Sequence, residues 1–230
     1  MTGKLYYGDN LEILRKYLKD ETIDLCYIDP PFNSKRNYNQ IYNNIGSEDR
    51  AQAQAFVDTW VWDEQANEGL VEILANDKGR FVSQTIDLIK GLHPVLKKGS
   101  LLAYLISITL RVTEIHRVLK PTGSFYLHCD PTASHYLKLI LDTIFVSSGG
   151  NFRNEIVWAY RKWSVKQHQF AHNHDIILFY TKSSGNNNTF NTQFAPVSEG
   201  TLKRWKGKKQ QAVFVDGVRK ATSSDDAVSE

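Results

Sequence analysis

The sequence predicts an α/β protein built on a doubly wound sheet. Short apolar runs, each followed by chain-breaking residues, alternate with longer segments whose apolar residues recur at helical spacing. The 230 residues are 41% hydrophobic, which is enough for one sizeable core with an appendage. The apolar run from Leu101 to Leu110 is too short to cross a membrane, and the amino terminus lacks a signal-peptide pattern.

The expected elements follow one another in the order typical of such a fold. We expect strands at residues 4–7, 23–28, 124–129, 155–161 and 175–181, and helices at 10–19, 48–75 (a break allowed), 80–96, 99–119 and 132–147. Residues 120–123, Lys-Pro-Thr-Gly, are expected to end the fourth helix, because Pro and Gly stop helices. The polar, Asn-rich stretch at 33–50 predicts a loop near the site.

The second strand ends abruptly in Asp29-Pro30-Pro31-Phe32. The two prolines cannot continue a sheet ladder, so the chain must turn out at the carboxyl end of the strand. In open α/β sheets ligands bind at this edge. The sequence therefore predicts a carboxylate, a rigid carbonyl and an aromatic ring at a binding crevice.

These groups suit methylation of an exocyclic amino group on a nucleobase. Asp29 and the carbonyl of Pro30 can each accept one N–H of the amine and favour a pyramidal nitrogen that attacks a sulfonium methyl. Phe32 can stack on a base extruded from the duplex. An ordinary strand-to-loop turn, with an unremarkable Asp and two stiffening prolines, explains the tetrapeptide alone equally well.

Asp29-Pro30-Pro31-Phe32 resembles the catalytic D/N/S-P-P-Y/F motif of amino-methylating DNA methyltransferases. Segments similar to other family motifs follow the family's order, at residues 7–14, 117–130, 154–158 and 174–182. The resemblance implies a Rossmann-like methyltransferase sheet, incomplete in this chain, and a branch that includes the modification subunits of type III restriction systems. In this family an Asp at the head of the motif is associated with adenine N6.

The resemblance also implies S-adenosylmethionine as the cofactor, with Asp9 and Asp29 as the candidate cofactor-binding residues. For Asp9 an Asx-type turn is an equally good explanation. The family's Gly-rich cofactor motif, D-P-F-x-G-x-G-T, does not occur in the sequence. We therefore expect an amino-terminal part of an enzyme: a truncated frame, one piece of a split gene, or a fragment.

The positive charge is concentrated in the last third of the chain. Residues 1–152 carry a net charge of −2 and residues 153–220 a net charge of +8. We expect a partial catalytic core at 1–152 and a target-recognition segment at 153–230, with a disordered tail at 221–230. The candidate DNA-binding residues are Arg161, Lys162, Lys166, Lys203, Arg204 and Lys206, which alternate with aromatic residues. A solvated basic loop remains the alternative.

Two functional classes remain open. One is an enzyme, or the catalytic part of one, that methylates adenine N6 in double-stranded DNA. The other is a non-catalytic DNA-binding remnant or one piece of a split methyltransferase. A homodimer, a restriction subunit and a complementing downstream polypeptide remain open as partners. Methyl transfer needs no metal, and none is expected. The two cysteines suggest small buried residues in a reducing compartment, and thus the cytoplasm.

Overall fold

The computed structural model describes residues 3–31, 36–38, 56–58, 60–161, 168, 170–192, 200, 213–215 and 218–220. The chain divides into two compact units, Met1–Thr189 and Phe190–Glu230. In the second unit the structure describes a short antiparallel hairpin, formed by β7 (Val213–Val215) and β8 (Val218–Lys220). All elements described below belong to the first unit.

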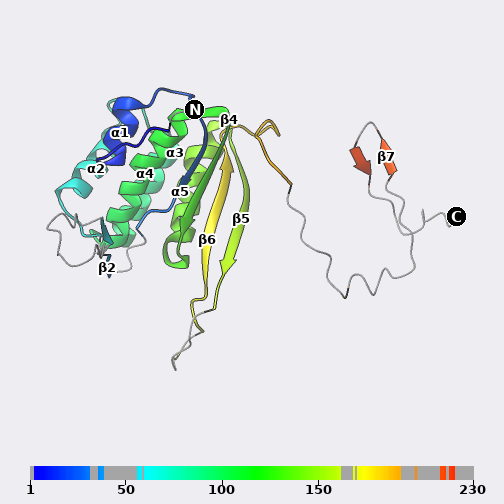
Figure 1. The fold of residues 1–230 in the computed structure, drawn as a ribbon. Helices are drawn as coiled ribbons and strands as arrows, with labels where there is room; N and C mark the ends of the chain where they lie inside the picture. Colours follow the sequence, from blue (N-terminus) through cyan, green and yellow to red (C-terminus); the bar gives the residue numbers. More distant parts are fainter. Residues whose placement is uncertain are drawn as a thin grey trace, which may run out of the picture. The chain divides into compact units, whose positions relative to one another are not determined.

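The first unit is built on a four-stranded sheet in the order β1-β4-β6-β5 (Figure 1). Its strands are β1 (Ile23–Ile28), β4 (Leu119–Cys129), β5 (Asn151–Ala159) and β6 (His174–Thr181). β1 and β4 are parallel, whereas β6 is antiparallel to both of its neighbours. A separate two-stranded ladder joins β2 (Arg36–Tyr38) to β3 (Phe56–Asp58).

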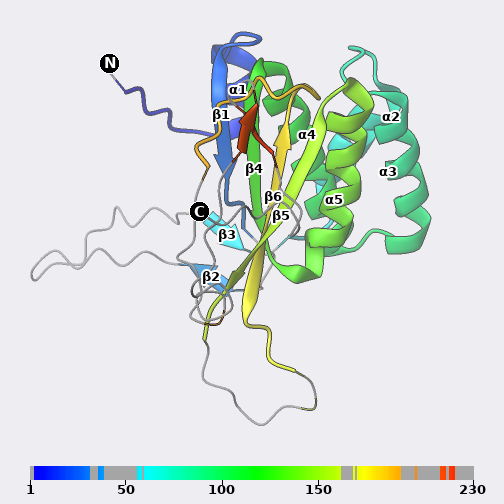
Figure 2. The same ribbon diagram turned by 90° about the vertical axis from the view of Figure 1, so that its right-hand side faces the viewer.

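The helices of the first unit cover one face of this sheet (Figures 1 and 2). They are α1 (Asn10–Tyr17), α2 (Glu64–Ala75), α3 (Ser83–Leu96), α4 (Ser100–Val118), α5 (Pro131–Phe145) and the 3-10 turn η1 (Val146–Ser148). α4 is the most buried of them and packs against the other four α-helices. Among the described helices none is long and apolar enough to cross a bilayer.

The alternation of side chains in β4 decides which face meets the helices. Phe125, Leu127 and Cys129 are fully buried, in the core shared with α4 and α5. On β1, Leu25 and Tyr27 are 58% and 48% exposed, because no described helix covers the opposite face. Strand periodicity of two therefore gives the sheet one core face and one open face in the described part of the chain.

The structure confirms the predicted α/β class and most of the expected elements. The strand predicted at 4–7 is wrong: these residues pair with no described strand, and Leu5 and Tyr7 are almost fully exposed. The helix predicted at 48–75 begins only at Glu64, where Asp63 caps it, and β3 lies within the predicted range. The fourth helix ends at Val118, just before residues 120–123 as predicted, and these residues belong to β4, which starts at Leu119.

The predicted division at residue 152 does not coincide with the boundary of the compact units. β5 and β6 follow this residue, yet both pair within the core sheet. Both strands therefore have a structural role: β6 pairs with the edge of β4 that faces away from β1. The functional part of the prediction, that residues 153–230 recognise DNA, stays a prediction.

Candidate active site

Asp29 lies where it was expected, immediately after the last residue of β1. Ile28 pairs with Leu127 of the parallel strand β4, so Asp29 follows at the carboxyl edge of the sheet. Its side chain is 56% exposed, and Pro30 and Pro31 are partly buried. The carboxylate is therefore accessible at the edge where α/β sheets bind ligands. Phe32 lies outside the described residues.

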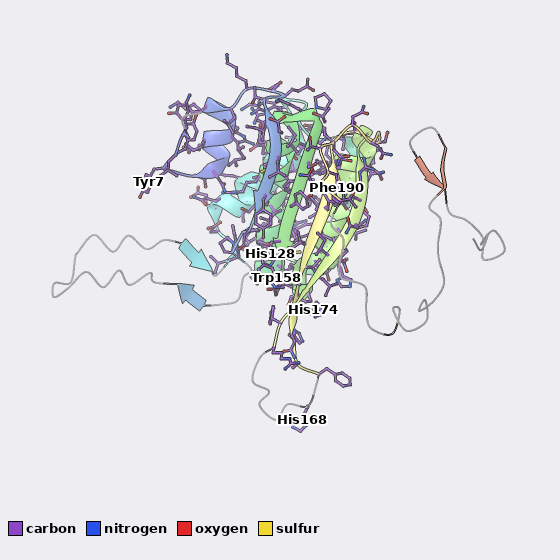
Figure 3. The ribbon with its side chains drawn as sticks, turned by 45° about the vertical axis from the view of Figure 1, so that its right-hand side comes forward. Tyr7, His128, Trp158, His168, His174 and Phe190 are labelled. Atoms are coloured by element: carbon purple, nitrogen blue, oxygen red, sulfur yellow. The ribbon has the colours of Figure 1, made fainter. Side chains whose placement is uncertain are left out.

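His128, near the end of β4, is the immediate neighbour of Asp29. Its Nδ1 lies 3.3 Å from Asp29 Oδ1, and its side chain is only 9% exposed. The hydroxyl of Tyr27 lies 3.2 Å from the same nitrogen. Figure 3 shows the imidazole together with Trp158 at the end of the sheet toward which β1 runs.

Residues of the β5–β6 hairpin hold the other side of the His128 ring. Nε2 lies 3.5 Å from Asp175 Oδ2, and the Trp158 indole stacks on the imidazole with centroids 5.7 Å apart. Asp175 also accepts a hydrogen bond of 3.0 Å from the Tyr160 hydroxyl. The register explains this grouping, because Trp158 and Asp175 are direct partners in the β5–β6 ladder.

The contacts of the two ring nitrogens constrain which of them carries the hydrogen. An unprotonated Nδ1 would turn its lone pair toward the carboxylate 3.3 Å away, an unfavourable contact between two acceptors. Partial burial and the charge of Asp29 raise the pKa of Tyr27, so its phenol keeps its proton and can donate it to an unprotonated Nδ1. An unprotonated Nε2 would in turn face the Asp175 carboxylate at 3.5 Å. The contacts therefore accommodate the hydrogen on either nitrogen, and donation toward Asp29 requires it on Nδ1.

Asp9, the second candidate cofactor residue, caps α1. Its Oδ1 accepts a 2.7 Å hydrogen bond from the Leu11 amide, which is the Asx-type turn that the sequence left open. Its Oδ2 lies 2.8 Å from the Arg111 guanidinium. Burial lowers the pKa of Arg111, and the Asp9 charge partly offsets this effect. Both carboxylate oxygens of Asp9 thus already have partners within the protein.

The predicted DNA-binding residues are mostly beyond the described residues. Arg161 is described and exposed, directly after β5. Lys162, Lys166, Lys203, Arg204 and Lys206 lie outside the described residues.

Two other cations in the positively charged segment have structural roles. Arg153 donates hydrogen bonds to Thr181, Asn186 and Asn188 and thereby holds the turn after β6. Lys182 donates to the Leu119 carbonyl at 2.7 Å. The net charge of +8 therefore overstates the charge available to DNA.

Neither cysteine is suited to nucleophilic catalysis. Burial raises the pKa of Cys26 to about 11 and, with help from nearby carboxylates, that of Cys129 to about 12. A thiol attacks as the thiolate, which is scarce at neutral pH at these values. Both cysteines are free; Cys129 is buried, as expected, whereas Cys26 is only partly buried.

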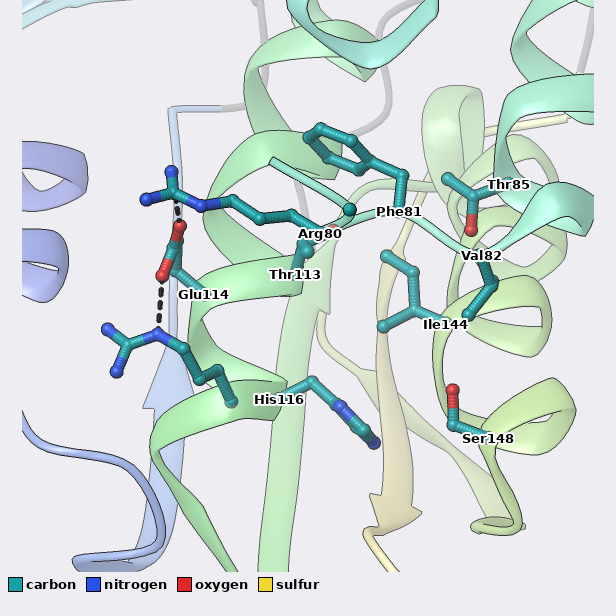
Figure 4. A pocket seen from close by; sticks show the side chains of 11 residues that line it. Arg80, Phe81, Val82, Thr85, Thr113, Glu114, His116, Ile144 and Ser148 are labelled. Carbon is teal, nitrogen blue, oxygen red and sulfur yellow. Dashed lines mark hydrogen bonds and ion pairs between the residues drawn. The ribbon is translucent and has the colours of Figure 1, made fainter. Parts of the chain in front are cut away.

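A cavity of about 280 Å³ lies at the opposite edge of the helical layer, where α4 and α5 end (Figure 4). The lining residues include His116, Thr113 and Ser148. Glu114, beside the cavity, is 2% exposed and pairs with Arg80 at 3.0 Å and Arg117 at 2.7 Å. This end of the unit holds a buried ion-pair network that includes none of the residues around Asp29. Among the described residues, no group of three or more His, Cys, Asp or Glu side chains is arranged to hold a metal ion.

The sequence prediction missed His128, Tyr27, Asp175 and Trp158 as members of the site. Their common signal is a ladder register that no local pattern reveals, since they come from four strands. Alternation along β4 was the one available clue: with Phe125 and Leu127 facing the core, His128 had to face away from it. Asp130, an alternative candidate near the crevice, instead caps α5 by accepting a hydrogen bond from the Ala133 amide.

Comparison with known families agrees with this geometry. The sequence model of the DNA methylase family, which comprises N6 and N4 methyltransferases, matches residues 23–226. The match begins at the first residue of β1 and includes the Asp29 motif. The chain belongs to this family, whose methyl donor is S-adenosylmethionine.

Two curated relatives are similar over parts of their length. Type II methyltransferase M.KpnI of Klebsiella pneumoniae is 26% identical over 185 residues, which make up 79% of this chain and 33% of that protein. The Mod subunit of the type III restriction-modification enzyme StyLTI of Salmonella typhimurium (strain LT2) is 26% identical over 157 residues, 67% of this chain and 20% of that protein. The chain thus spans a third or less of these relatives.

Two solved structures are more distant. The cytosine-N4-specific PvuII DNA methyltransferase is 12% identical, with a TM-score of 0.42, and the alignment covers 87% of this chain and 61% of that one. M1.HpyAVI, solved as a complex with S-adenosylmethionine (SAM), is 13% identical, with a TM-score of 0.30 and coverage of 56% and 70%. At such values these likenesses leave the target base open.

The described residues fit S-adenosylmethionine only in part. Asp29 offers an exposed carboxylate at the edge of the sheet, but both oxygens of Asp9 are engaged by Leu11 and Arg111. The Gly-rich motif that the family resemblance assigns to the cofactor does not occur in the sequence. A complete cofactor site needs groups beyond these.

Proposed function

We propose that this chain carries the catalytic motif of a DNA methyltransferase that methylates adenine N6. One observation carries the proposal: Asp29 is an exposed carboxylate at the carboxyl edge of the sheet, and two prolines and a neighbouring histidine fix its surroundings. Membership of the DNA methylase family supports it. The choice of adenine rests on the Asp at the head of the motif.

The chemistry that we assign to the chain's own residues is positioning and charge stabilisation. The Asp29 carboxylate and the Pro30 carbonyl accept the two N–H bonds of the target amine, so that its lone pair points away from both. Phe32 stacks on the extruded base. As positive charge develops on the nitrogen, the Asp29 carboxylate stabilises it and can take up the released proton. When bound, S-adenosylmethionine supplies an electrophilic methyl group.

We further propose that a complementing polypeptide completes the cofactor site. Among the described residues, β1 pairs with a strand on one side only, and Leu25 and Tyr27 on its open face are 58% and 48% exposed. Both relatives are at least three times as long as the part that matches. An added strand could pair with the open edge of β1, and an element packed on the open face would bury these apolar side chains.

For DNA recognition we propose the positively charged segment after β5, where Arg161 is exposed, together with Lys162, Lys166, Lys203, Arg204 and Lys206. Cations in this number favour phosphate contacts and salt-sensitive binding. We place the reaction in the cytoplasm, where DNA and reducing conditions coincide. The alternative is a non-catalytic DNA-binding remnant, which would bind DNA but would not transfer a methyl group.

The test is transfer of a labelled methyl group to unmethylated duplex DNA, with and without the complementing polypeptide. Asp29→Asn should lower the rate at least a hundredfold and leave DNA binding within about threefold, because the change removes one charge-stabilising contact from the reaction alone. Asp24→Asn is the matched control: it removes an exposed carboxylate of β1 that pairs with Lys120, well away from Asp29. Binding without transfer under both conditions would favour the remnant.

A further inference from the structure

We infer that His128 is a positioning residue, which holds the Asp29 carboxylate in the orientation that methyl transfer requires and is itself held by Asp175 and Trp158 of the β5–β6 hairpin. The inference deepens the proposed function and rests on it. The family match covers the region but assigns no role to this side chain.

The first step is the contact between the two side chains. Asp29 is 56% exposed, so water alone would leave its carboxylate free to rotate, whereas a hydrogen on Nδ1, 3.3 Å away, would give one oxygen a fixed donor. The second oxygen remains available to the solvent side. A carboxylate with one oxygen fixed and one free can accept a hydrogen bond from a substrate amine in a defined direction.

The second step is the support of the imidazole. The ring is 9% exposed and has neighbours on each of its functional sides: Tyr27 beside Nδ1 at 3.2 Å, Asp175 near Nε2 at 3.5 Å and Trp158 against its face. Asp175 is in turn fixed by the Tyr160 hydroxyl at 3.0 Å. A ring with neighbours beside both nitrogens and on one face has little rotational freedom to lose during the reaction.

The third step is that packing alone does not explain a histidine here. The neighbouring positions of β4 on the same face are Ser124 and Tyr126, and an apolar ring would also stack on Trp158. His128 lies within 3.3 Å of one carboxylate, from the loop after β1, and within 3.5 Å of another, from β6. An apolar side chain could donate a hydrogen bond to neither.

The arrangement also connects the catalytic turn to the proposed recognition segment. Trp158 and Tyr160 lie at the end of β5, and the exposed Arg161 follows directly. The bridge Asp29–His128–Asp175 thus begins at the proposed reaction centre and ends beside the first proposed DNA contact. Because His128 itself contacts Asp29, its loss should affect the reaction step more than the binding of either substrate.

The kinetic test uses the protein together with its complementing polypeptide if the chain alone is inactive. His128→Leu should lower kcat about 10- to 100-fold, the usual effect of losing a group that orients a catalytic residue, with KM for DNA within about threefold. His128→Asn, whose amide N–H can take the place of Nδ1–H, should recover at least about fivefold of the loss. Asp130→Asn, which preserves the α5 cap, is the control and should change kcat less than twofold. An unchanged kcat in His128→Leu, or equal loss in the Leu and Asn variants, would overturn the inference.

A second readout does not depend on activity. The ring resonances of His128, assigned by their loss in His128→Leu, should move in the NMR spectrum of the Asp29→Asn variant and of the Asp175→Asn variant, but not of Asp130→Asn. Absence of any response to Asp29→Asn would overturn the positioning role even if the enzyme is active. If neither the chain nor the complemented enzyme transfers methyl groups while His128 does respond, the proposed function fails and the contact stands.

Discussion

The buried end of α4 offers a quantitative prediction, because His116 is placed where its charged form is disfavoured. Its Nε2 is buried and has no hydrogen-bond partner among the described residues, and its ring packs edge-on against Phe145 with centroids 5.0 Å apart. Burial, and to a smaller extent the charge of Lys182, lowers the pKa of His116 from 6.5 to about 4. The folded protein therefore binds this proton less readily than the unfolded chain.

The sign and size of the effect follow from linkage. Since the pKa is depressed in the folded state, the contribution to stability is complete above pH 6.5 and is lost as the pH falls toward 4. One pKa unit corresponds to about 1.4 kcal/mol, so the full shift represents about 3 kcal/mol. Because His116 is only partly buried, we expect about 2 kcal/mol of this to be lost between pH 7.5 and 4.5.

The perturbation is His116→Gln, and the measurement is urea unfolding at pH 7.5 and at pH 4.5. The free energy of unfolding should fall less between these values in the variant than in the wild type, by about 2 kcal/mol. His135→Gln, which replaces an exposed histidine of α5, should behave like the wild type. Equal losses in the wild type and His116→Gln would refute the reasoning, because titration of other groups would then account for the whole effect.

Three further substitutions test the packing of the helical layer, and a labelling experiment tests the burial of β4. Glu114→Gln should lower the free energy of unfolding by about 2–3 kcal/mol in urea titrations, because the 2% exposed carboxylate holds three partly exposed arginines at 2.7–3.1 Å. Gly69→Ala should cost about 1–3 kcal/mol in the same assay, since its Cβ would lie 2.8 Å from Ile106 Cγ2; Gly91→Ala, with nothing within 4 Å, should instead stabilise by up to about 1 kcal/mol. Cys129 should react with a thiol reagent only as fast as the protein opens, because its pKa is raised to about 12; rapid labelling of the native protein would contradict this.

The sequence predicted elements best where local signals were strong. β1 has the expected bounds, 23–28, because an apolar run is closed by Asp and two prolines, and α5 begins with Pro131 after the capping Asp130. The false strand at 4–7 came from the aromatic and apolar residues Leu5 and Tyr7, which pack against nothing in the described part of the chain. The composition of residues 4–7 did not show that they have no partner strand in the described part of the chain.

The site was predictable only in its first residue. Asp29 could be recognised from the two prolines that follow it. His128, Trp158 and Asp175 become neighbours only through the pairing of β4, β6 and β5. Such pairing joins positions about 50 residues apart and depends on the whole sheet. The charge pattern located the excess of basic residues but did not show which of them are free to contact DNA. Arg153 and Lys182, for example, form hydrogen bonds that stabilise the fold.

The central claim is that Asp29 directs methyl transfer to the amino group of adenine. The most direct measurement is nucleoside analysis of duplex DNA after incubation with labelled S-adenosylmethionine, the chain and its complementing polypeptide, in parallel with the Asp29→Asn protein. The account predicts label in N6-methyladenine and its near-complete loss in the variant. Label in N4-methylcytosine would contradict the assignment of adenine, and label that survives Asp29→Asn would contradict the role of this carboxylate.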